Sequence, residues 1–143
     1  MDKKEVHPPC TELLPELEKE QKNNRHISEK ALKRISNKTG IPISRVYATA
    51  SFYSHLHFEE QGKYIIEICD SPSCYLNGSI DVIKFLEKEL KIKSGQTTKN
   101  KKFSIHVCSC IGCCNKAPAM MINKNVYGNL TKEKIKQIIR KCK

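Results

Sequence analysis

Cysteine is the residue type whose number and spacing in this chain could support chemistry. Eight cysteines occur among 143 residues, and they concentrate in two short stretches. The first stretch contains Cys69 and Cys74, and the second runs over residues 108–114. A reducing cytosol disfavours structural disulfides, so cysteines clustered in this way are typical of metal ligands or of catalytic thiols.

The spacing of four of these cysteines narrows the choice of metal. The pattern is C-x(4)-C-x(35)-C-x(3)-C, formed by Cys69, Cys74, Cys110 and Cys114. Four thiolates suit either a [2Fe–2S] cluster or a tetrahedral zinc ion. Structural zinc usually takes cysteine pairs separated by two residues, whereas gaps of four and three suit loops that reach around a two-iron core. The spacing therefore favours a [2Fe–2S] cluster, and a zinc-stabilised structural or binding module is the alternative.

A third hypothesis comes from Cys110 and Cys113, which form a C-x-x-C sequence. Thiol–disulfide exchange of the thioredoxin type needs the first cysteine at a helix N-terminus, where its pKa falls. The residues after Cys113 lead instead into Ala117-Pro118 and an expected strand. This context disfavours thiol exchange.

The remaining cysteines and histidines receive no metal in this interpretation. Cys108 is expected to serve as a small buried apolar residue. Cys10 and Cys142 lie near the termini and are assigned no role. His55 and His57 have no cysteine near them in sequence, so we expect solvated histidines.

Two aromatic residues and two glycines complete the candidate residues. Phe52 and Tyr53 are expected to pack between domains, with a role in an interface as the alternative. Gly78 and Gly112 are expected to permit tight turns beside the cluster. Backbone N–H groups at such turns could donate hydrogen bonds to sulfur and tune the cluster.

Helical signals fill the first third of the chain. Helices are expected over 11–23 with Thr11 as cap, over 28–39 with Ser28 as cap, and over 44–56 with Ser44 as cap. Pro15 would fall in the first turn of the first helix, and Gly40 would end the second. We therefore expect a small helical bundle over residues 1–60.

The pattern changes near residue 61. Strands are expected over 63–69 and 103–108, followed by a hairpin of 118–122 and 126–128, and helices are expected over 77–92 and from Thr131 onward. This order predicts an α/β (α+β) chain, in which a four-stranded mixed sheet occupies residues 61–143. Both cysteine pairs follow a strand, so their loops would meet at one sheet edge if the two strands are neighbours.

Charge and hydropathy limit the classes of partner. The formal net charge is +11, and residues 61–143 hold 16 Lys and Arg against 6 Asp and Glu. The lysines follow the polar faces of helices, with little arginine and no interleaved aromatics, so we expect no nucleic acid partner. Such a face could dock an acidic protein. The longest apolar runs have four or five residues and no secretory signal is visible, so a cytoplasmic chain without direct membrane insertion is expected.

A family resemblance covers nearly the whole chain, from about residue 11 to 142. The matching stretches are Leu13-Leu14-Pro15, His26-Ile27-Ser28, Thr39-Gly40-Ile41-Pro42, 50–54, 69–78, 110–114, Ala117-Pro118, Tyr127-Gly128 and Leu130-Thr131. In these motifs the chain resembles the thioredoxin-like [2Fe–2S] ferredoxin subunit of NADH-linked enzymes. That family includes the E subunit of NADH dehydrogenase (complex I), with relatives in NAD(P)-dependent hydrogenases and formate dehydrogenases.

The resemblance implies a thioredoxin-like fold that holds one [2Fe–2S] cluster where thioredoxin has its thiols. The four family ligands carry over onto Cys69, Cys74, Cys110 and Cys114. The resemblance also implies a flavin- and NAD(P)-binding partner subunit, together with further iron–sulfur, hydrogenase or formate dehydrogenase subunits. The chain shows no Gly-rich dinucleotide motif of its own, so it is expected to transfer electrons and to have no catalytic activity alone.

Some positions depart from the family, and the host complex is a separate question. Cys113 stands where a small residue is usual, Asn115 replaces a usual glycine, and the loop 98–101 lacks a common Asp-Gly turn. The abundance of Lys, Asn and Ile suggests an AT-rich genome. It favours a soluble, possibly electron-bifurcating hydrogenase or formate dehydrogenase, with the E subunit of respiratory NADH:quinone oxidoreductase as the alternative.

Overall fold

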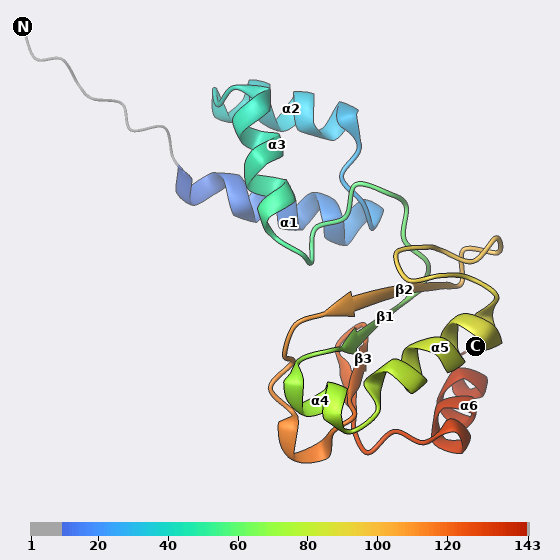
Figure 1. Ribbon diagram of the computed structural model, residues 1–143. Coiled ribbons are helices and arrows are strands. Elements are labelled where there is room, and N and C mark those ends of the chain that lie inside the picture. Colours follow the sequence, from blue (N-terminus) through green and yellow to red (C-terminus); the bar gives the residue numbers. More distant parts are fainter. Residues whose placement is uncertain (1–9, 143) are drawn as a thin grey trace, which may run out of the picture. The chain divides into compact units, whose positions relative to one another are not determined.

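The computed structural model describes residues 10–142 of the chain (Figure 1). The chain divides into two compact units, with the boundary between Glu60 and Gln61. Each unit is described by itself. In the described part of the chain, no helix has the length and apolar character needed to cross a membrane.

The N-terminal unit is built from helices. They are α1 (Cys10–Asn24), α2 (Glu29–Thr39) and α3 (Ile43–Phe52). Their apolar faces and the following segment form one core, made of Leu13, Leu17, Ile27, Ala31, Leu32, Ile35, Ile41, Val46, Ala50 and Leu56. Leu17 and Val46 are fully buried in it. A core of this kind holds the unit by apolar burial alone.

The expected caps of α2 are confirmed. The side chain of Ser28 accepts a hydrogen bond from the N–H of Ala31 at 3.2 Å. Gly40 follows the helix with φ of +71°, and its N–H donates to the carbonyl oxygen of Ser36 at 2.9 Å. A left-handed residue is the usual end of a helix, because it turns the chain while satisfying a terminal carbonyl group.

The helix boundaries predicted for α1 and α3 are wrong. Helix α1 already includes Cys10, so Thr11 lies within it, although the side chain of Thr11 is outside the described residues. Pro15 therefore falls beyond the first turn. Helix α3 begins at Ile43 after Pro42, which leaves Ser44 inside the first turn instead of at the cap. Proline at a helix start supplies the required φ without a side-chain hydrogen bond, and this signal outweighs the serine.

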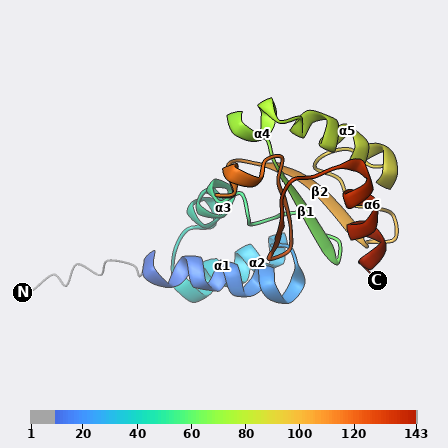
Figure 2. The same ribbon diagram turned by 90° about the horizontal axis from the view of Figure 1, so that it is seen from below.

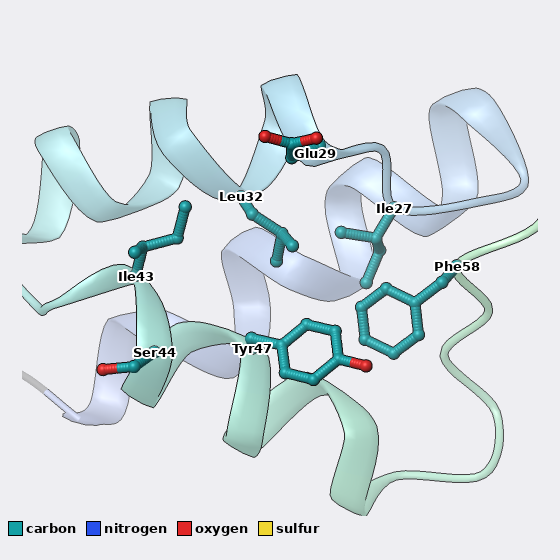
Figure 3. A pocket seen from close by; sticks show the side chains of 7 residues that line it. All are labelled: Ile27, Glu29, Leu32, Ile43, Ser44, Tyr47 and Phe58. Atoms are coloured by element: carbon teal, nitrogen blue, oxygen red, sulfur yellow. The ribbon is translucent and has the colours of Figure 1, made fainter.

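An apolar hollow of about 420 Å³ opens on this unit. Figure 3 shows its lining, which consists of Ile27, Glu29, Leu32, Ile43, Ser44, Tyr47 and Phe58. The rings of Tyr47 and Phe58 lie together along one wall, with centroids 4.9 Å apart. The lining contains no cysteine, so this hollow is not part of the thiol chemistry.

The C-terminal unit is a mixed four-stranded sheet with helices. Its elements are β1 (Tyr64–Cys69), α4 (Pro72–Leu76), α5 (Ser79–Leu90), β2 (Phe103–Cys108), a 3-10 helix (Cys114–Lys116), β3 (Met120–Ile122), β4 (Asn125–Tyr127) and α6 (Lys132–Lys141). The strand order is β2-β1-β3-β4, with β1 and β2 parallel and the other neighbours antiparallel. The predicted α/β fold class, with its helical N-terminal part and mixed sheet, is confirmed.

One face of the sheet carries the core of this unit. Ile66, Ile68, Ile105 and Met120 are fully buried on it and pack with residues of α5 and α6 (Figures 1 and 2). Alternation of side chains along a strand places these residues on one face. The expected alternation breaks at Val107, which is 39% exposed. Val107 lies next to the end of β2, an edge strand of the sheet.

The segment between β1 and α5 differs from the prediction. A separate short helix, α4, precedes α5, and α5 begins at Ser79 instead of residue 77. Gly78 separates the two helices with φ of +89°. The hairpin of β3 and β4 is confirmed, with Asn123 in a left-handed conformation at the turn. The cap on α6 is also confirmed, because the Thr131 side chain accepts from the N–H of Lys134.

Candidate cluster-binding site

Two loops at one edge of the sheet carry the cysteines of the predicted site. Cys69 is the last residue of β1, and Cys74 lies in α4. Cys110 follows the end of β2, and Cys114 opens the 3-10 helix. Because β1 and β2 are parallel neighbours, with Cys69 opposite Cys108, the chain leaves both strands at the same edge. The neighbouring-strand arrangement expected for the two loops is present.

The four thiols form an inner and an outer pair. Cys69 and Cys74 are each 1% exposed, and with Ala119 they form a small apolar cluster. Their side chains hydrogen-bond to each other. Cys110 and Cys114 are exposed, and their Sγ atoms lie 3.4 Å apart. The chain therefore holds one pair of thiols in its interior and the other at its surface.

Hydrogen bonds between the two loops join these pairs into one site. The N–H of Ile111, in the second loop, donates to Cys69 in the first. The hydroxyl of Ser71, in the first loop, bonds to Cys110 in the second. Within residues 10–142 no group of three or more His, Cys, Asp or Glu side chains is arranged to hold a single metal ion.

Each pair contains one thiol with a lowered pKa and one with a raised pKa. Burial acts to raise the pKa of Cys69, but hydrogen bonds from the Ser71 hydroxyl and from backbone N–H groups outweigh it and lower the pKa. The N–H of Gly112 is the main cause of the lowered pKa of Cys110. Burial raises the pKa of Cys74, and the hydrogen bond with Cys110 raises the pKa of Cys114. One thiolate in each pair is thus stabilised before any metal arrives.

The glycine turns expected beside the cluster are present. Gly78 and Gly112 have φ of +89° and +81°, a region that other residues enter only at a cost. The turn at Gly112 aims its N–H at Cys110 Sγ, 3.4 Å away. An N–H group directed at sulfur is a device by which a protein stabilises charge on a thiolate ligand.

A strap over the second loop was not identified from the sequence. The N–H of Asn129 donates to the carbonyl oxygen of Lys116 at 2.6 Å, and the N–H of Leu130 donates to that of Pro118 at 3.2 Å. Gly128 lies so close to this loop that a Cβ atom there would be 2.7 Å from the oxygen of Lys116. The Tyr127-Gly128 match of the resemblance was the available signal, but its reason is this backbone contact across the fold.

The other cysteines occupy different environments. Cys108 is half-buried, and burial raises its pKa to about 12. Cys113 is partly buried against the small cluster around Cys69 and Cys74. Cys142 packs on the main core, and burial raises its pKa. The side chain of Cys10 lies outside the described residues.

Two further expectations concern the N-terminal unit. The side chain of His55 is 52% exposed and its Nε2 lies 3.8 Å from Oε1 of Glu18, as a solvated histidine would be placed. Phe52 is 82% exposed, and its ring meets the edge of Tyr53. Their predicted packing between domains stays a prediction.

This donor set fits an iron–sulfur cluster. Four thiols converge from two interlocked loops, apolar residues surround the inner pair, and backbone N–H groups point at sulfur. Soft thiolates with such donors are the ligands that iron–sulfur clusters take in proteins. Fold and site together define an iron–sulfur protein built on a sheet in which thioredoxin would carry redox thiols.

The comparison with known families agrees. The profile of the thioredoxin-like [2Fe-2S] ferredoxin family matches residues 3–143, and the chain belongs to this family. Its cofactor is accordingly one [2Fe–2S] cluster, as expected. The E subunit of NADH-quinone oxidoreductase from Rickettsia felis is 37% identical over 128 residues, which are 89% of this chain and 77% of the relative. The corresponding protein from Escherichia coli K12 is 37% identical over 123 residues, covering 86% and 74%.

A solved structure shares the fold over most of the chain. It is the crystal structure of an NAD⁺-reducing [NiFe]-hydrogenase in the H₂-reduced state, with a TM-score of 0.74 and 26% identity. The match covers 88% of this chain but only 22% of the hydrogenase chain. The remainder of that larger chain has no counterpart here.

Proposed function

We propose that the chain is an electron-transfer subunit of an NADH-linked oxidoreductase, and that Cys69, Cys74, Cys110 and Cys114 hold its [2Fe–2S] cluster. The observation that supports this ligand set is the interlocking of the two loops, with Cys69 and Cys74 inside and Cys110 and Cys114 outside, 3.4 Å apart. When bound, the cluster supplies one-electron redox chemistry that protein side chains lack.

The residues of the chain hold and tune the site. Cys69 and Cys74 anchor it in the apolar interior beside Ala119. The N–H groups of Ile111 and Gly112 donate to sulfur and stabilise negative charge there. The exposed outer pair leaves one side of the site accessible from the surface, where an electron can pass to or from a partner.

Cys113 and Cys108 are proposed to be packing residues. The Sγ of Cys110 contacts that of Cys114, and Cys113 packs with its neighbours on the small apolar cluster. The residues after Cys113 form a 3-10 helix of only three residues, so Cys110 does not begin a helix that would activate it for thiol exchange.

The partner is proposed to be a flavin- and NAD(P)-binding subunit of the same complex. We propose a soluble hydrogenase or formate dehydrogenase as host, supported by the composition of the chain and by its fold match to an NAD⁺-reducing hydrogenase. Respiratory NADH:quinone oxidoreductase is the second candidate, favoured by the 37% identity to the E subunits of two bacterial enzymes. Mass spectrometry of subunits that co-purify from the native cell separates the two hosts.

A cysteine series tests the ligand set. Serine at 69, 74, 110 or 114 should abolish or strongly perturb the visible spectrum and the paramagnetic resonance of the reduced protein, because a serine oxygen is a harder ligand. Alanine at 108 or 113 should leave iron content and both signals unchanged. Loss of the cluster in Cys113→Ala, with retention in Cys114→Ala, would overturn the assignment. A colourless protein that contains zinc would support the structural module instead.

The chain alone is proposed to oxidise no NADH. NADH–dye reductase activity in the pure, flavin-free subunit would contradict this proposal.

A further inference from the structure

Exposed apolar side chains of the C-terminal unit concentrate beside the thiol loops. Among its described residues, the large apolar side chains that are exposed are Tyr75, Leu76, Ile80, Val107 and Val126. Three of these five lie within residues 75–80, directly after Cys74. Leu76 is 83% exposed and Tyr75 is 55% exposed. We call Tyr75, Leu76 and Ile80 the α4 patch.

The geometry of α4 explains why the patch faces outward. Successive residues of a helix are rotated by about 100°, so a one-turn helix that buries Cys74 turns Tyr75 and Leu76 away from it. Cys74 is 1% exposed and belongs to the small apolar cluster of the site. The same helix therefore presents a proposed ligand to the interior and an apolar surface to the outside.

The backbone of the patch is held in place. The N–H of Tyr75 donates to the carbonyl oxygen of Ser71 at 2.9 Å, and the side chain of Asn77 donates to that of Ser73 at 2.7 Å. The N–H of Gly78 returns to the carbonyl oxygen of Tyr75 at 3.1 Å. An apolar surface on a preorganised backbone loses little conformational entropy on binding.

A contact between the loops connects this surface to the outer thiols. The hydroxyl of Ser73, in α4, lies 3.4 Å from the carbonyl oxygen of Cys114. A protein that covers α4 therefore lies against the loop that carries the exposed Cys110 and Cys114. Short separation between redox groups is what an electron-transfer contact requires.

Charge indicates the chemistry of the occupant. Residues 61–143 carry 16 basic against 6 acidic residues, while the positions next to the patch include both signs, with Asp81 and Lys84 exposed on α5. A second copy of the chain would bring the same positive charge and be repelled. An acidic protein would be attracted over a distance and could then bury the apolar patch.

We infer that the α4 patch is the docking surface for the electron-transfer partner, and that the partner presents an apolar hollow within an acidic surface. The inference rests on the proposed function, since it takes the flavin-bearing subunit as that partner. Buried apolar contacts determine how long the complex lasts, whereas the lysines increase its rate of formation.

The test measures binding of the cluster-loaded chain to the separately purified flavin-bearing subunit of its own complex. Tyr75→Ser combined with Leu76→Ser should weaken binding about thirtyfold, the effect of an interface hot spot, mainly through faster dissociation. Val126→Ser is the matched control, because Val126 is 45% exposed on β4, and it should change binding less than twofold. Added salt should slow association of the wild-type chain and leave dissociation almost unchanged.

Other outcomes separate the inference from the proposed function. Unchanged visible and paramagnetic resonance spectra in the double variant would show that the patch acts in docking and not in holding the cluster. Equal binding of wild type and double variant would overturn the docking surface while the proposed function stands. Absence of binding by the wild type would overturn both. Loss of binding to phosphatidylserine vesicles alone would assign the patch to a membrane and overturn the inference.

Discussion

The N-terminal helices and the thiol loops are stabilised by different means. The helical unit buries a continuous set of aliphatic side chains, and local caps such as Ser28 and Gly40 end its helices. The thiol loops around Cys69 and Cys110 have only a small apolar cluster, and they depend on glycine turns, on hydrogen bonds to sulfur and on a strap from Gly128. The comparison suggests that the helical unit keeps its form without metal, whereas the loops need the cluster as a cross-link.

Removal of the cluster should have the largest effect, and it should be confined to the loops. Chelation or Cys74→Ser should lower the thermal midpoint of the C-terminal unit by roughly 10 °C or more, because each kcal/mol moves a domain of this size by about 4–8 °C. Amide exchange should accelerate over residues 69–78 and 108–118 and stay unchanged over 29–39. Equal protection of the loops in the apo protein would contradict this coupling of metal binding to folding.

Leu17→Ala should produce the opposite pattern. Leu17 is fully buried among the helices of the N-terminal unit, so its truncation should cost about 3 kcal/mol through lost burial and a cavity. Chemical denaturation followed by circular dichroism measures the loss. The cluster spectrum should not change, and a shift of its resonance would show that the two regions are less independent than the comparison implies.

Gly128→Ala should destabilise the strap by about 2 kcal/mol, the usual cost of overpacking. The new Cβ would lie 2.7 Å from the carbonyl oxygen of Lys116, so either the strap or the thiol loop must move. Cluster loss on dilution or oxidation should accelerate with it. Gly95→Ala is the control, since Gly95 has φ of +85° with open space around it. It should cost about 1 kcal/mol from backbone strain alone and leave the cluster lifetime unchanged.

The smallest effect concerns the caps of the helical unit. Ser28→Ala should cost about 1 kcal/mol, because the N–H of Ala31 loses its acceptor. Ser44→Ala should change stability by less than about 0.5 kcal/mol, because α3 begins at Ile43 and Ser44 is not its cap. Denaturation midpoints of the two variants measure the difference, and equal losses would argue against the helix start seen here.

Local patterns in the sequence predicted a large share of the fold. Alternating apolar residues predicted β1 and β2, and Ser28, Gly40 and Thr131 were recognised as helix ends. These features depend on neighbours in the chain, so a short window contains the whole signal. The boundaries of α1 and α3 and the separate helix α4 were missed, because competing cap signals lie within a few residues of one another.

The ligand assignment itself came from the cysteine spacing and the family motifs, and it stays a prediction until iron is measured. What the sequence by itself determined is the chemical type of the site, since four thiolates at these gaps suit two irons. Only the tertiary structure decided that Cys69 and Cys74 form the inner pair and that Cys110 and Cys114 remain exposed. The same is true of the contact between Gly128 and the second loop. Such facts arise where segments far apart in the chain meet, and burial at those meetings leaves no periodic trace in the sequence.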